Sequence, residues 1–267
     1  MEPKNAPWHA RFAITLALLL PVYFALAALG TKFGLWSWQV GLGSLIIGAG
    51  PMLLGIVAAL AVVSLILIVR KAPRNGWWVP ALAFAVPAGI FAMLASTGGT
   101  AEANPIHDVA TDTANPPVFS ETTMAVRTDS EANPVSDYAT PLSQIEWWSE
   151  RASDELKGKS HAEIVAELYP TLTSLPAANA SQEDALEAVK GGMEDLGLSD
   201  ITVSAEAGTV EGVAETFWFG FKDDVVARVA DGKIDFRSVS RVGVSDLGAN
   251  SKRIMKLRTL VASRLGE

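Results

Sequence analysis

The pattern of apolar and polar residues divides the chain into a uniformly apolar first third and an alternating remainder. Three uncharged runs before residue 100 predict transmembrane helices at about 12–31, 45–69 and 77–96. About twenty apolar residues are enough to cross the ~30 Å hydrocarbon core of a bilayer as a helix. The middle run extends over 40–69, longer than a straight span needs, so we expect the Gly48–Pro51 region to redirect it.

Beyond residue 100 the apolar positions alternate, which predicts strands with one buried face. Val225, Ala227 and Val229 fall on one face of such a strand. The pair Asp231–Gly232 then predicts a hairpin turn, because glycine adopts a positive φ at no steric cost. Residues 233–240 continue as the return strand, so the pairing is an antiparallel meander.

Helices accompany these strands. Ser160 and Ser181 each begin a capping box, and Pro170 is expected to end the first of the two helices. A last helix with Asp246 as its N-cap follows from apolar residues at spacings of three and four. These residues are Ile254, Leu257, Val261 and Leu265.

The predicted fold class is therefore a membrane protein with three N-terminal transmembrane helices and a soluble α+β domain. The domain combines an antiparallel β-meander with packed helices. We expect a transmembrane anchor at 1–96, a flexible linker at 97–105 and the soluble domain at 106–267.

The distribution of charge predicts the orientation. Basic residues lie before the first span and between the second and third spans: Lys4, Arg11, Arg70, Lys71 and Arg74. The connection between the first two spans holds only Lys32. Because cytoplasmic loops carry an excess of Lys and Arg, three spans place the C-terminal domain outside the cytoplasm. A cleaved signal peptide at 8–28 is an alternative interpretation, and it leaves the domain on the same side.

The amino-acid composition excludes some classes of partner and binding site. The chain carries a formal net charge of −8 and no cysteine. Residues 1–99 hold six Lys/Arg and one Asp/Glu, while residues 100–267 hold fifteen and twenty-eight. Such an acidic domain is a poor electrostatic match for nucleic acid, so we expect no nucleic-acid partner. The absence of cysteine excludes disulfides and thiolate metal sites.

Three stretches carry a family resemblance: IHDVATDTANPPVF at 106–119, FGFKDDVVARV at 219–229, and GKIDFRSVSRVGVSDLGAN at 232–250, with Arg253–Ile254 beyond. They resemble the bacterial and plastid family called domain of unknown function 1499. The resemblance covers about 104–265 and excludes residues 1–100. It implies a bacterial host, hence the inner membrane and a periplasmic domain, and it implies no activity.

One segment departs from the family pattern. Residues 131–153, with Pro134, Pro141 and Trp147–Trp148, form a local elaboration without a counterpart in the resemblance. The two tryptophans are candidates for contact with the membrane surface, with a partner or with the core.

His107 and Asp112, with Asp108 between them, are the first chemical candidates. A histidine beside carboxylates suits a general base or part of a metal site. No second histidine lies nearby in sequence, which favours hydrogen bonding within an ordered loop. We therefore predict no metal and no cofactor.

A second candidate is an anion-binding pocket at the start of the last helix, where free N–H groups and the positive end of the helix dipole attract anions. Its residues are Arg237, Ser238, Ser240, Arg241, Ser245, Asp246 and Asn250. The alternative is an ion pair between Arg241 and Asp246. Asp246 would itself fill the dipole, which argues against a bound anion.

A third candidate is Asp223–Asp224 with Glu211 and Glu215, a carboxylate group suited to acid–base work or Ca²⁺. We place Asp223–Asp224 in a turn, where aspartate bonds to the local backbone. This favours a structural role.

The chain contains no nucleophile elbow, P-loop, dinucleotide fingerprint or HExxH motif. The preferred hypothesis is a non-enzymatic protein of the cell envelope whose domain binds a protein partner or a small ligand beside the lipid bilayer. The alternative is a membrane-bound hydrolase- or isomerase-like enzyme that uses His107, Asp112, Arg237 and Arg241 around one cleft.

Overall fold

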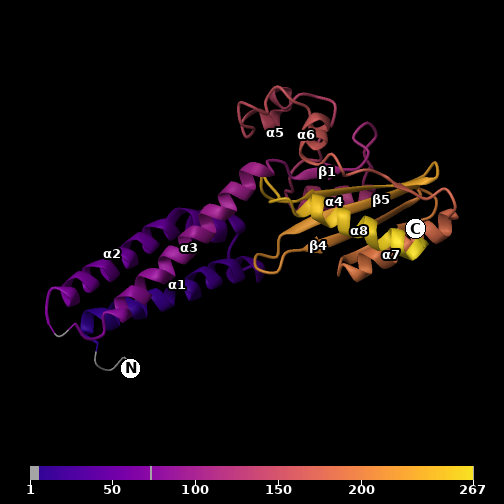
Figure 1. Ribbon diagram of the computed structural model, residues 1–267. Coiled ribbons are helices and arrows are strands. Elements are labelled where there is room, and N and C mark those ends of the chain that lie inside the picture. Colours follow the sequence, from indigo (N-terminus) through magenta and orange to yellow (C-terminus); the bar gives the residue numbers. More distant parts are fainter. Residues whose placement is uncertain (1–5, 73, 267) are drawn as a thin grey trace. The chain divides into compact units, whose positions relative to one another are not determined.

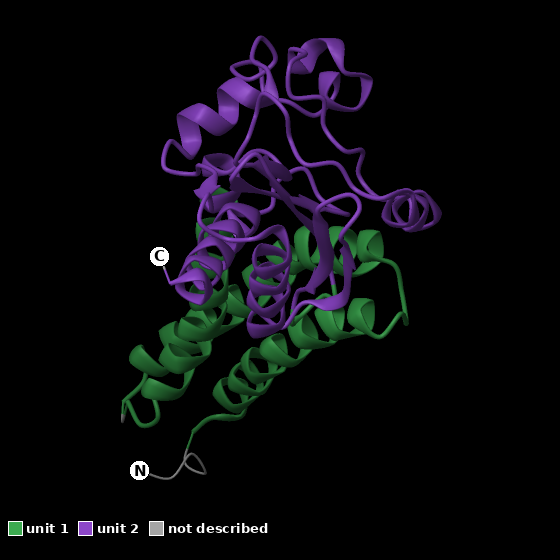
Figure 2. Cartoon of the chain, turned by 90° about the vertical axis from the view of Figure 1, so that its right-hand side faces the viewer, with its two compact units in different colours: residues 1–99, 217–220 green, residues 100–216, 221–267 purple. Residues whose placement is uncertain are grey.

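The computed structural model describes residues 6–72 and 74–266. The chain forms two compact units (Figure 2). Unit 1 comprises residues 1–99 together with 217–220, and unit 2 comprises residues 100–216 together with 221–267.

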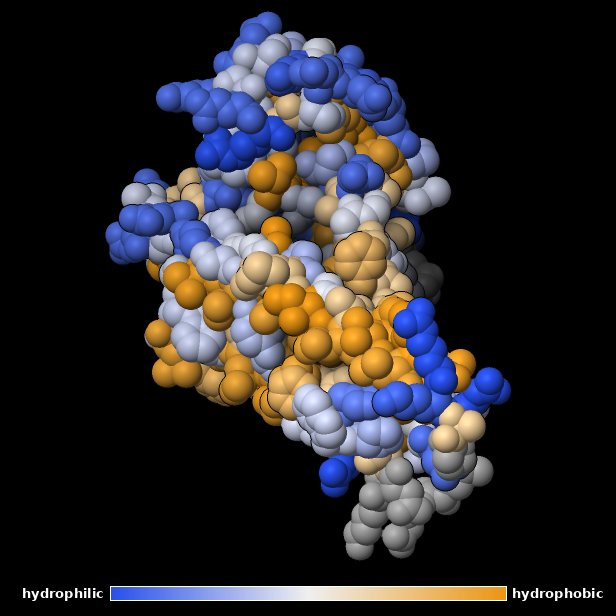
Figure 3. Space-filling view, turned by 90° about the vertical axis from the view of Figure 1, so that its left-hand side faces the viewer, coloured by the Kyte–Doolittle hydropathy of each residue, from blue (hydrophilic) through white to orange (hydrophobic). Residues whose placement is uncertain are grey.

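Unit 1 is helical (Figure 1). Its elements are α1 (Trp8–Lys32), the π-helix η2 (Gln39–Ala49), α2 (Gly50–Val69) and most of α3 (Trp78–Ala103). The segments Trp8–Lys32, Gln39–Val69 and Trp78–Ala103 are long and apolar enough to cross a membrane. Figure 3 shows apolar side chains gathered over these helices. The prediction of three membrane-spanning helices is confirmed.

The middle segment changes its winding where the sequence predicts a redirection. The wide turns of η2 give way to regular α-helix at Gly50, and Pro51 occupies the first turn of α2. Proline has no N–H to donate to a carbonyl of the preceding turn, so the change of winding falls where one helical hydrogen bond is missing.

Basic residues gather at one end of the helical bundle. Ala6 and Ala10 pack against Ile68 and Val79. This brings Arg11 of α1 to the same end as the connection after α2, which holds Arg70, Lys71 and Arg74. Lys32 ends α1 at the opposite end. Lys4, which also entered the orientation argument, lies outside the described residues.

Helix α3 continues to Ala103, through residues predicted as part of a flexible linker. A helix that is already nucleated adds one hydrogen bond for each residue it fixes, so extension is cheap. Thr97 Oγ1 donates to Met93 O at 3.0 Å, and Asn104 Nδ2 donates to Thr100 O at 2.9 Å, which supports the last turns.

Unit 2 is built on an antiparallel sheet (Figure 1). The strand order is β1-β6-β5-β4-β3, and β2 also pairs with β6. The strands are β1 (Asp108–Ala110), β2 (Leu175–Pro176), β3 (Ser199–Ser204), β4 (Thr209–Glu215), β5 (Lys222–Ala230) and β6 (Lys233–Ser240). Asp231 (φ 52°) and Gly232 (φ 71°) join β5 to β6 with two positive φ angles, which confirms the predicted hairpin.

The helices of unit 2 are α4 (Glu121–Asp129), η3 (Leu142–Gln144), α5 (Glu146–Ser149), α6 (His161–Leu168), α7 (Gln182–Asp195) and α8 (Ala249–Leu265). Ser160 and Glu163 form the predicted capping box at α6. At α7, Ser181 Oγ accepts from Asp184 N, which is one half of such a box. The prediction of a soluble domain with an antiparallel sheet and packed helices is confirmed.

Different helices pack on the two faces of the sheet. Val225, Ala227, Ile234 and Phe236 point to α7 and α8 and belong to the main apolar core. The opposite face carries Val226, Val239 and a series of charged side chains, and α4 with its flanking loops covers it. The second face positions most of the candidate site residues.

Candidate functional site

The fully buried ion pair between Asp108 and Arg237 lies at the centre of the charged face. Asp108 on β1 is 0% exposed and Arg237 on β6 is 3% exposed. The guanidinium donates from Nε to Oδ1 at 3.0 Å and from Nη2 to Oδ2 at 2.7 Å. Burial acts to raise the pKa of Asp108, but the charge and hydrogen bonds of Arg237 outweigh it and hold the pKa at about 2.

Other donors and acceptors complete this pair. Ser136 N–H and the Tyr138 hydroxyl donate to Asp108 at 2.8 and 2.9 Å. Arg237 also donates from Nη1 to the carbonyl of Pro117 and from Nη2 to that of Ser136, each at 3.1 Å. Arg237 is therefore a structural cation that joins four segments.

A second cluster forms around Asp224. Arg127 of α4 donates to it at 2.5 Å, and Arg241 donates at 2.6 and 3.0 Å. Asp224 and Asp223 lie within β5, so the prediction that they occupy a turn is wrong. The two carboxylates can be buried in a strand because cations neutralise them. Arg127 of α4 and Arg241, directly after β6, pair with Asp224, and Arg253 of α8 donates to Asp223 at 2.6 Å. Arg241 pairs with Asp224, so the alternative of an Arg241–Asp246 pair is also wrong.

Asp112 lies at the other end of β6. Its carboxylate accepts from Lys233 Nζ at 2.8 Å and lies 3.4 Å from Arg228 Nη2. Burial acts to raise the pKa of Asp112, and the hydrogen bond from Lys233 lowers it, with a net lowering. Arg228 also pairs with Asp235 at 2.9 Å. We use the name ionic layer for the paired charged residues of this face. They are Asp108, Asp112, Asp224, Asp235, Arg127, Arg228, Lys233, Arg237 and Arg241.

Glu211 and Glu215 do not join Asp223 and Asp224 in a carboxylate cluster. Glu211 accepts hydrogen bonds from the backbone and hydroxyl of Ser120 at 2.5 and 2.9 Å, and from the hydroxyl of Thr123. It thus anchors the start of α4 to the sheet. Within the described residues, no group of three or more His, Cys, Asp and Glu side chains is arranged to hold a metal ion.

His107 is buried in an aromatic stack. Its ring lies 5.2 Å from that of Trp148, with 9° between the planes, and 4.8 Å from that of Trp147. His107 Nε2 is 3.1 Å from Pro134 O, and burial lowers the pKa of the ring. Trp148 is buried against the main core. Of the three roles open to the tryptophans, Trp148 therefore takes the core role.

His161 continues this stack on the other side of Trp148, at 5.1 Å between ring centroids. Its Nε2 is 3.1 Å from Ser136 Oγ. Burial lowers its pKa to about 4 from an ordinary 6.5, although the charge of Asp108 acts in the opposite direction. His161 Nδ1 has no hydrogen-bond partner among the described residues. The neutral ring is the form that the fold favours.

The start of α8 holds the predicted anion-pocket residues in an internal network. Asn250 Nδ2 donates to His107 O and Ser240 Oγ at 2.9 and 3.0 Å, and Asn250 Oδ1 accepts from Ser238 Oγ at 2.6 Å. Arg253 Nη1 donates to the same Oδ1 at 2.5 Å. All of these polar groups are satisfied by the chain itself.

Asp246 occupies the position where a bound anion would sit. Its carboxylate accepts from Gly248 N at 2.7 Å and Asn250 N at 2.8 Å. Burial raises its pKa to about 6 against these hydrogen bonds. The N-cap position belongs to Gly248 rather than Asp246, but the aspartate supplies the capping bonds. Ser245 Oγ accepts from Leu247 N at 3.0 Å.

The four residues of the enzyme hypothesis do not surround one cleft. His107 O accepts from Ser240 N beside one end of β6, whereas Asp112 binds Lys233 at the other end. Lys233 and Ser240, the two contacts on β6, are seven positions apart along the strand, roughly 23 Å at ~3.3 Å per residue. Arg237 and Arg241 bind Asp108 and Asp224. The arrangement thus has the chemistry of a structural ion-pair network.

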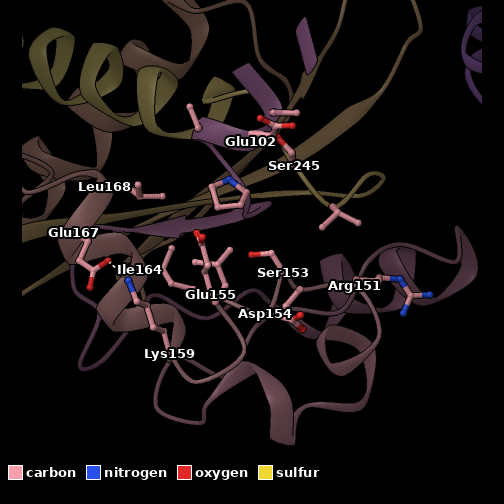
Figure 4. A pocket seen from close by; sticks show the side chains of 16 residues that line it. Glu102, Arg151, Ser153, Asp154, Glu155, Lys159, Ile164, Glu167, Leu168 and Ser245 are labelled. Atoms are coloured by element: carbon pink, nitrogen blue, oxygen red, sulfur yellow. Dashed lines mark hydrogen bonds and ion pairs between the residues drawn. The ribbon is translucent and has the colours of Figure 1, made fainter. Parts of the chain in front are cut away.

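A surface hollow in unit 2 has a different character (Figure 4). Its volume is about 860 Å³. Three segments line it: the end of α3 with Pro105, the loop 151–159 with α6, and Val244–Ser245 after β6. Its apolar lining consists of Ala101, Ala103, Pro105, Ala152, Leu156, Ile164, Leu168 and Val244.

Carboxylates dominate the rim of this hollow. Glu102, Asp154, Glu155 and Glu167 face it, against Arg151 and Lys159. Lys159 pairs with Glu167 at 2.5 Å, as Figure 4 shows, and Asp154 pairs with Lys157 at 2.8 Å. Glu102 and Glu155 have no ion-pair partner within the described part of the chain.

Sequence reasoning identified only Ser245 among the residues of the hollow. Of the other charged rim residues, Arg151, Asp154 and Glu155 lie in or just after the 131–153 elaboration, which has no counterpart in the resemblance. Glu102 lies at the end of α3, and Lys159 and Glu167 lie before and within α6. One feature of the sequence could have indicated this rim: the acidic stretch Glu150–Glu155 lies directly before the apolar Leu156.

The pKa of His161 predicts a loss of stability in acid. Because the folded pKa of about 4 lies below the ordinary 6.5, the unfolded chain binds more protons between these values, and stability falls as the pH falls from 6.5 to 4. At 1.36 kcal/mol per pKa unit the loss reaches about 3 kcal/mol by pH 4. This loss of stability is measured by urea unfolding of the full chain in detergent at a series of pH values, with tryptophan fluorescence as the signal.

The control is the variant His161→Gln, which cannot titrate. The raised pKa of Asp246 acts in the opposite direction in both proteins and cancels in the difference. We expect the free energy of unfolding of the parent chain to fall relative to the variant as the pH is lowered. Parallel pH profiles would contradict the assignment.

Comparison with known proteins adds the family. A family model described as "Protein of unknown function (DUF1499)" matches residues 108–261, more than half of the chain. No curated protein and no solved structure matches the chain. The match begins at Asp108 and includes the ionic layer and most of α8, while the three spans precede it. The chain therefore belongs to the DUF1499 family of proteins of unknown function.

Proposed function

We propose that this chain is a membrane-anchored binding protein of the bacterial cell envelope. Three helices hold it in the inner membrane, and the acidic α+β domain faces the periplasm. The hollow beside the end of α3 receives a segment of another envelope protein. The observation that carries the proposal is the combination of an apolar floor with an acidic rim on which Glu102 and Glu155 have no ion-pair partner among the described residues.

The orientation rests on the gathering of basic residues at one end of the helical bundle. Arg11, Arg70, Lys71 and Arg74 favour the cytoplasmic side by the positive-inside rule. An odd number of spans then puts the end of α3, and the domain that follows it, on the periplasmic side.

The chemistry of the hollow favours one class of partner. Apolar side chains such as Leu156 and Leu168 bury an apolar group of the partner, which is stabilising at about 25 cal/mol for each Å². Glu102 and Glu155 favour a Lys or Arg beside that group. The net negative charge of residues 100–267 steers a basic partner toward the domain from a distance.

A protein segment suits this site better than a substrate. The carboxylates of the ionic layer are paired with its guanidinium and ammonium groups, and within the described residues Arg127 Nε is the one buried nitrogen of the layer without an acceptor. These carboxylates are therefore held in ion pairs rather than free for acid–base catalysis. The hollow has an apolar floor and a charged rim. Protein-binding patches have this same arrangement of an apolar centre and a polar rim.

Orientation is tested with single cysteines, because the parent chain has none. In spheroplasts, a membrane-impermeant maleimide should label Glu206→Cys, in the exposed turn after β3, without lysis. Lys71→Cys, between α2 and α3, should be labelled only after lysis. Labelling of position 71 in intact spheroplasts with protection of position 206 would contradict the periplasmic placement.

Binding is tested by photocrosslinking in intact bacterial cells. Benzoylphenylalanine at the exposed rim position Leu168 should give a protein adduct. The charge reversal Glu155→Lys should abolish this adduct, because it places a cation where the partner's cation binds. The matched change Glu206→Lys, far from the hollow in sequence and on another loop, should leave the adduct unchanged.

Three outcomes would contradict the proposal. These are no adduct at Leu168, an adduct that survives Glu155→Lys, or an adduct whose mass is that of a small molecule. The third outcome would replace the protein partner with a small ligand at the same site.

A further inference from the structure

The loop that joins β4 to β5 exposes aromatic side chains. Residues 216–221 read Thr-Phe-Trp-Phe-Gly-Phe and carry no charge. Phe217 is 73% exposed and Trp218 is 53% exposed. Their neighbours in sequence on either side, Glu215 and Lys222, are the last paired residues of the two strands. The apolar character is therefore confined to the tip.

This tip has a fixed conformation. Thr216 N donates to Phe221 O at 2.8 Å, and Phe221 N donates to Thr216 Oγ1 at 2.9 Å, so the loop is closed at its base. Gly220 takes a positive φ of 68°, which allows the tight return. The rings of Phe217 and Trp218 contact edge to face at 5.3 Å. The two rings are thus held together and outward before any partner arrives, which lowers the entropic cost of binding.

Residues 217–220 of this tip belong to unit 1, the compact unit that contains the membrane spans. Within that unit, Lys32 Nζ donates to Phe217 O at 2.9 Å and lies 5.3 Å from the centre of the Phe217 ring. Lys32 is the last residue of α1. A lysine at the end of a span marks the boundary between hydrocarbon and water. With three spans, the ends of α1 and α3 face the same side.

We propose that Phe217 and Trp218 insert into the interfacial layer of the bilayer that the chain itself crosses. The tryptophan ring is stabilised there, because its apolar body meets the acyl chains while its indole N–H stays at the headgroups. The phenylalanine ring adds apolar area that is removed from water. The tether through α3 keeps the tip at a high effective concentration near the membrane, so a small gain in free energy is enough to hold it there.

The consequence is a second attachment for the soluble domain. The hairpin β4–β5 then contacts the bilayer in addition to the tether through α3.

The test places a nitroxide spin label in the cysteine-free full chain, reconstituted in liposomes of phosphatidylethanolamine and phosphatidylglycerol. The label is attached at Phe217→Cys, with Trp218 retained, or at the control Glu206→Cys in the turn between β3 and β4. Collision rates with oxygen, which concentrates in lipid, are compared with those of a water-soluble nickel chelate. The ratio of oxygen to nickel collisions should be higher at position 217 than at position 206.

The additional change Trp218→Ser should lower the ratio at position 217 toward that of the control. Equal ratios at 217 and 206 in these liposomes, which hold no protein other than the labelled chain, would overturn the proposal and leave a separate protein as the occupant of the tip. A ratio at 217 that rises with the amount of chain per lipid would also overturn it, because a second copy would then be shielding the label.

Discussion

The ion pair between Asp108 and Arg237 is the interaction on which the rest of the soluble domain depends. Two ions removed from water cost several kcal/mol each, and a bidentate geometry with further hydrogen bonds is needed to offset this. Both requirements are met, because Ser136, Tyr138 and Pro117 supply the remaining bonds. The pair fixes β1, the first strand after the membrane helices, to β6.

This attachment also forms the hollow. Pairing of β1 with β6 brings Pro105, just before β1, close to Val244 and Ser245, just after β6. The hydrogen bond from Ser240 N to His107 O extends that pairing by one residue. The stack of His107, Trp148 and His161 then holds α5 and α6 against the same edge, which completes the third wall of the hollow.

The carboxylates of the domain accordingly divide into two groups. Those of the ionic layer are neutralised by guanidinium and ammonium groups and stabilise the fold. Those on the surface, with Glu102 and Glu155 at the hollow, give the domain its negative field. A binding role for the surface group and a structural role for the buried group follow from this difference in environment.

Local features of the chain were predictable and long-range polar contacts were not. The spans, the Asp231–Gly232 turn and the faces of β5 and β6 follow from periodicities within a few residues. The pairing of Asp224 with Arg127 could not be found this way, because Arg127 lies 97 positions away and nothing local marks it. The short-range reading of Asp223–Asp224 as a turn was wrong for the same reason, and the helical end of α3 shows that Gly98–Gly99 did not stop a helix already formed.

The most direct test of the account is a double-mutant cycle on Asp108 and Arg237 in the full chain, read out as the free energy of urea unfolding in detergent. Asp108→Asn and Arg237→Met should each cost about 3–5 kcal/mol, because each leaves a buried charge unpaired. The double variant should lose much less than the sum of the two. The same cycle on the exposed pair Asp195–Arg264 should give a coupling of about 1 kcal/mol or less. A coupling between Asp108 and Arg237 no larger than that of this control pair would contradict the central role assigned to the buried ion pair.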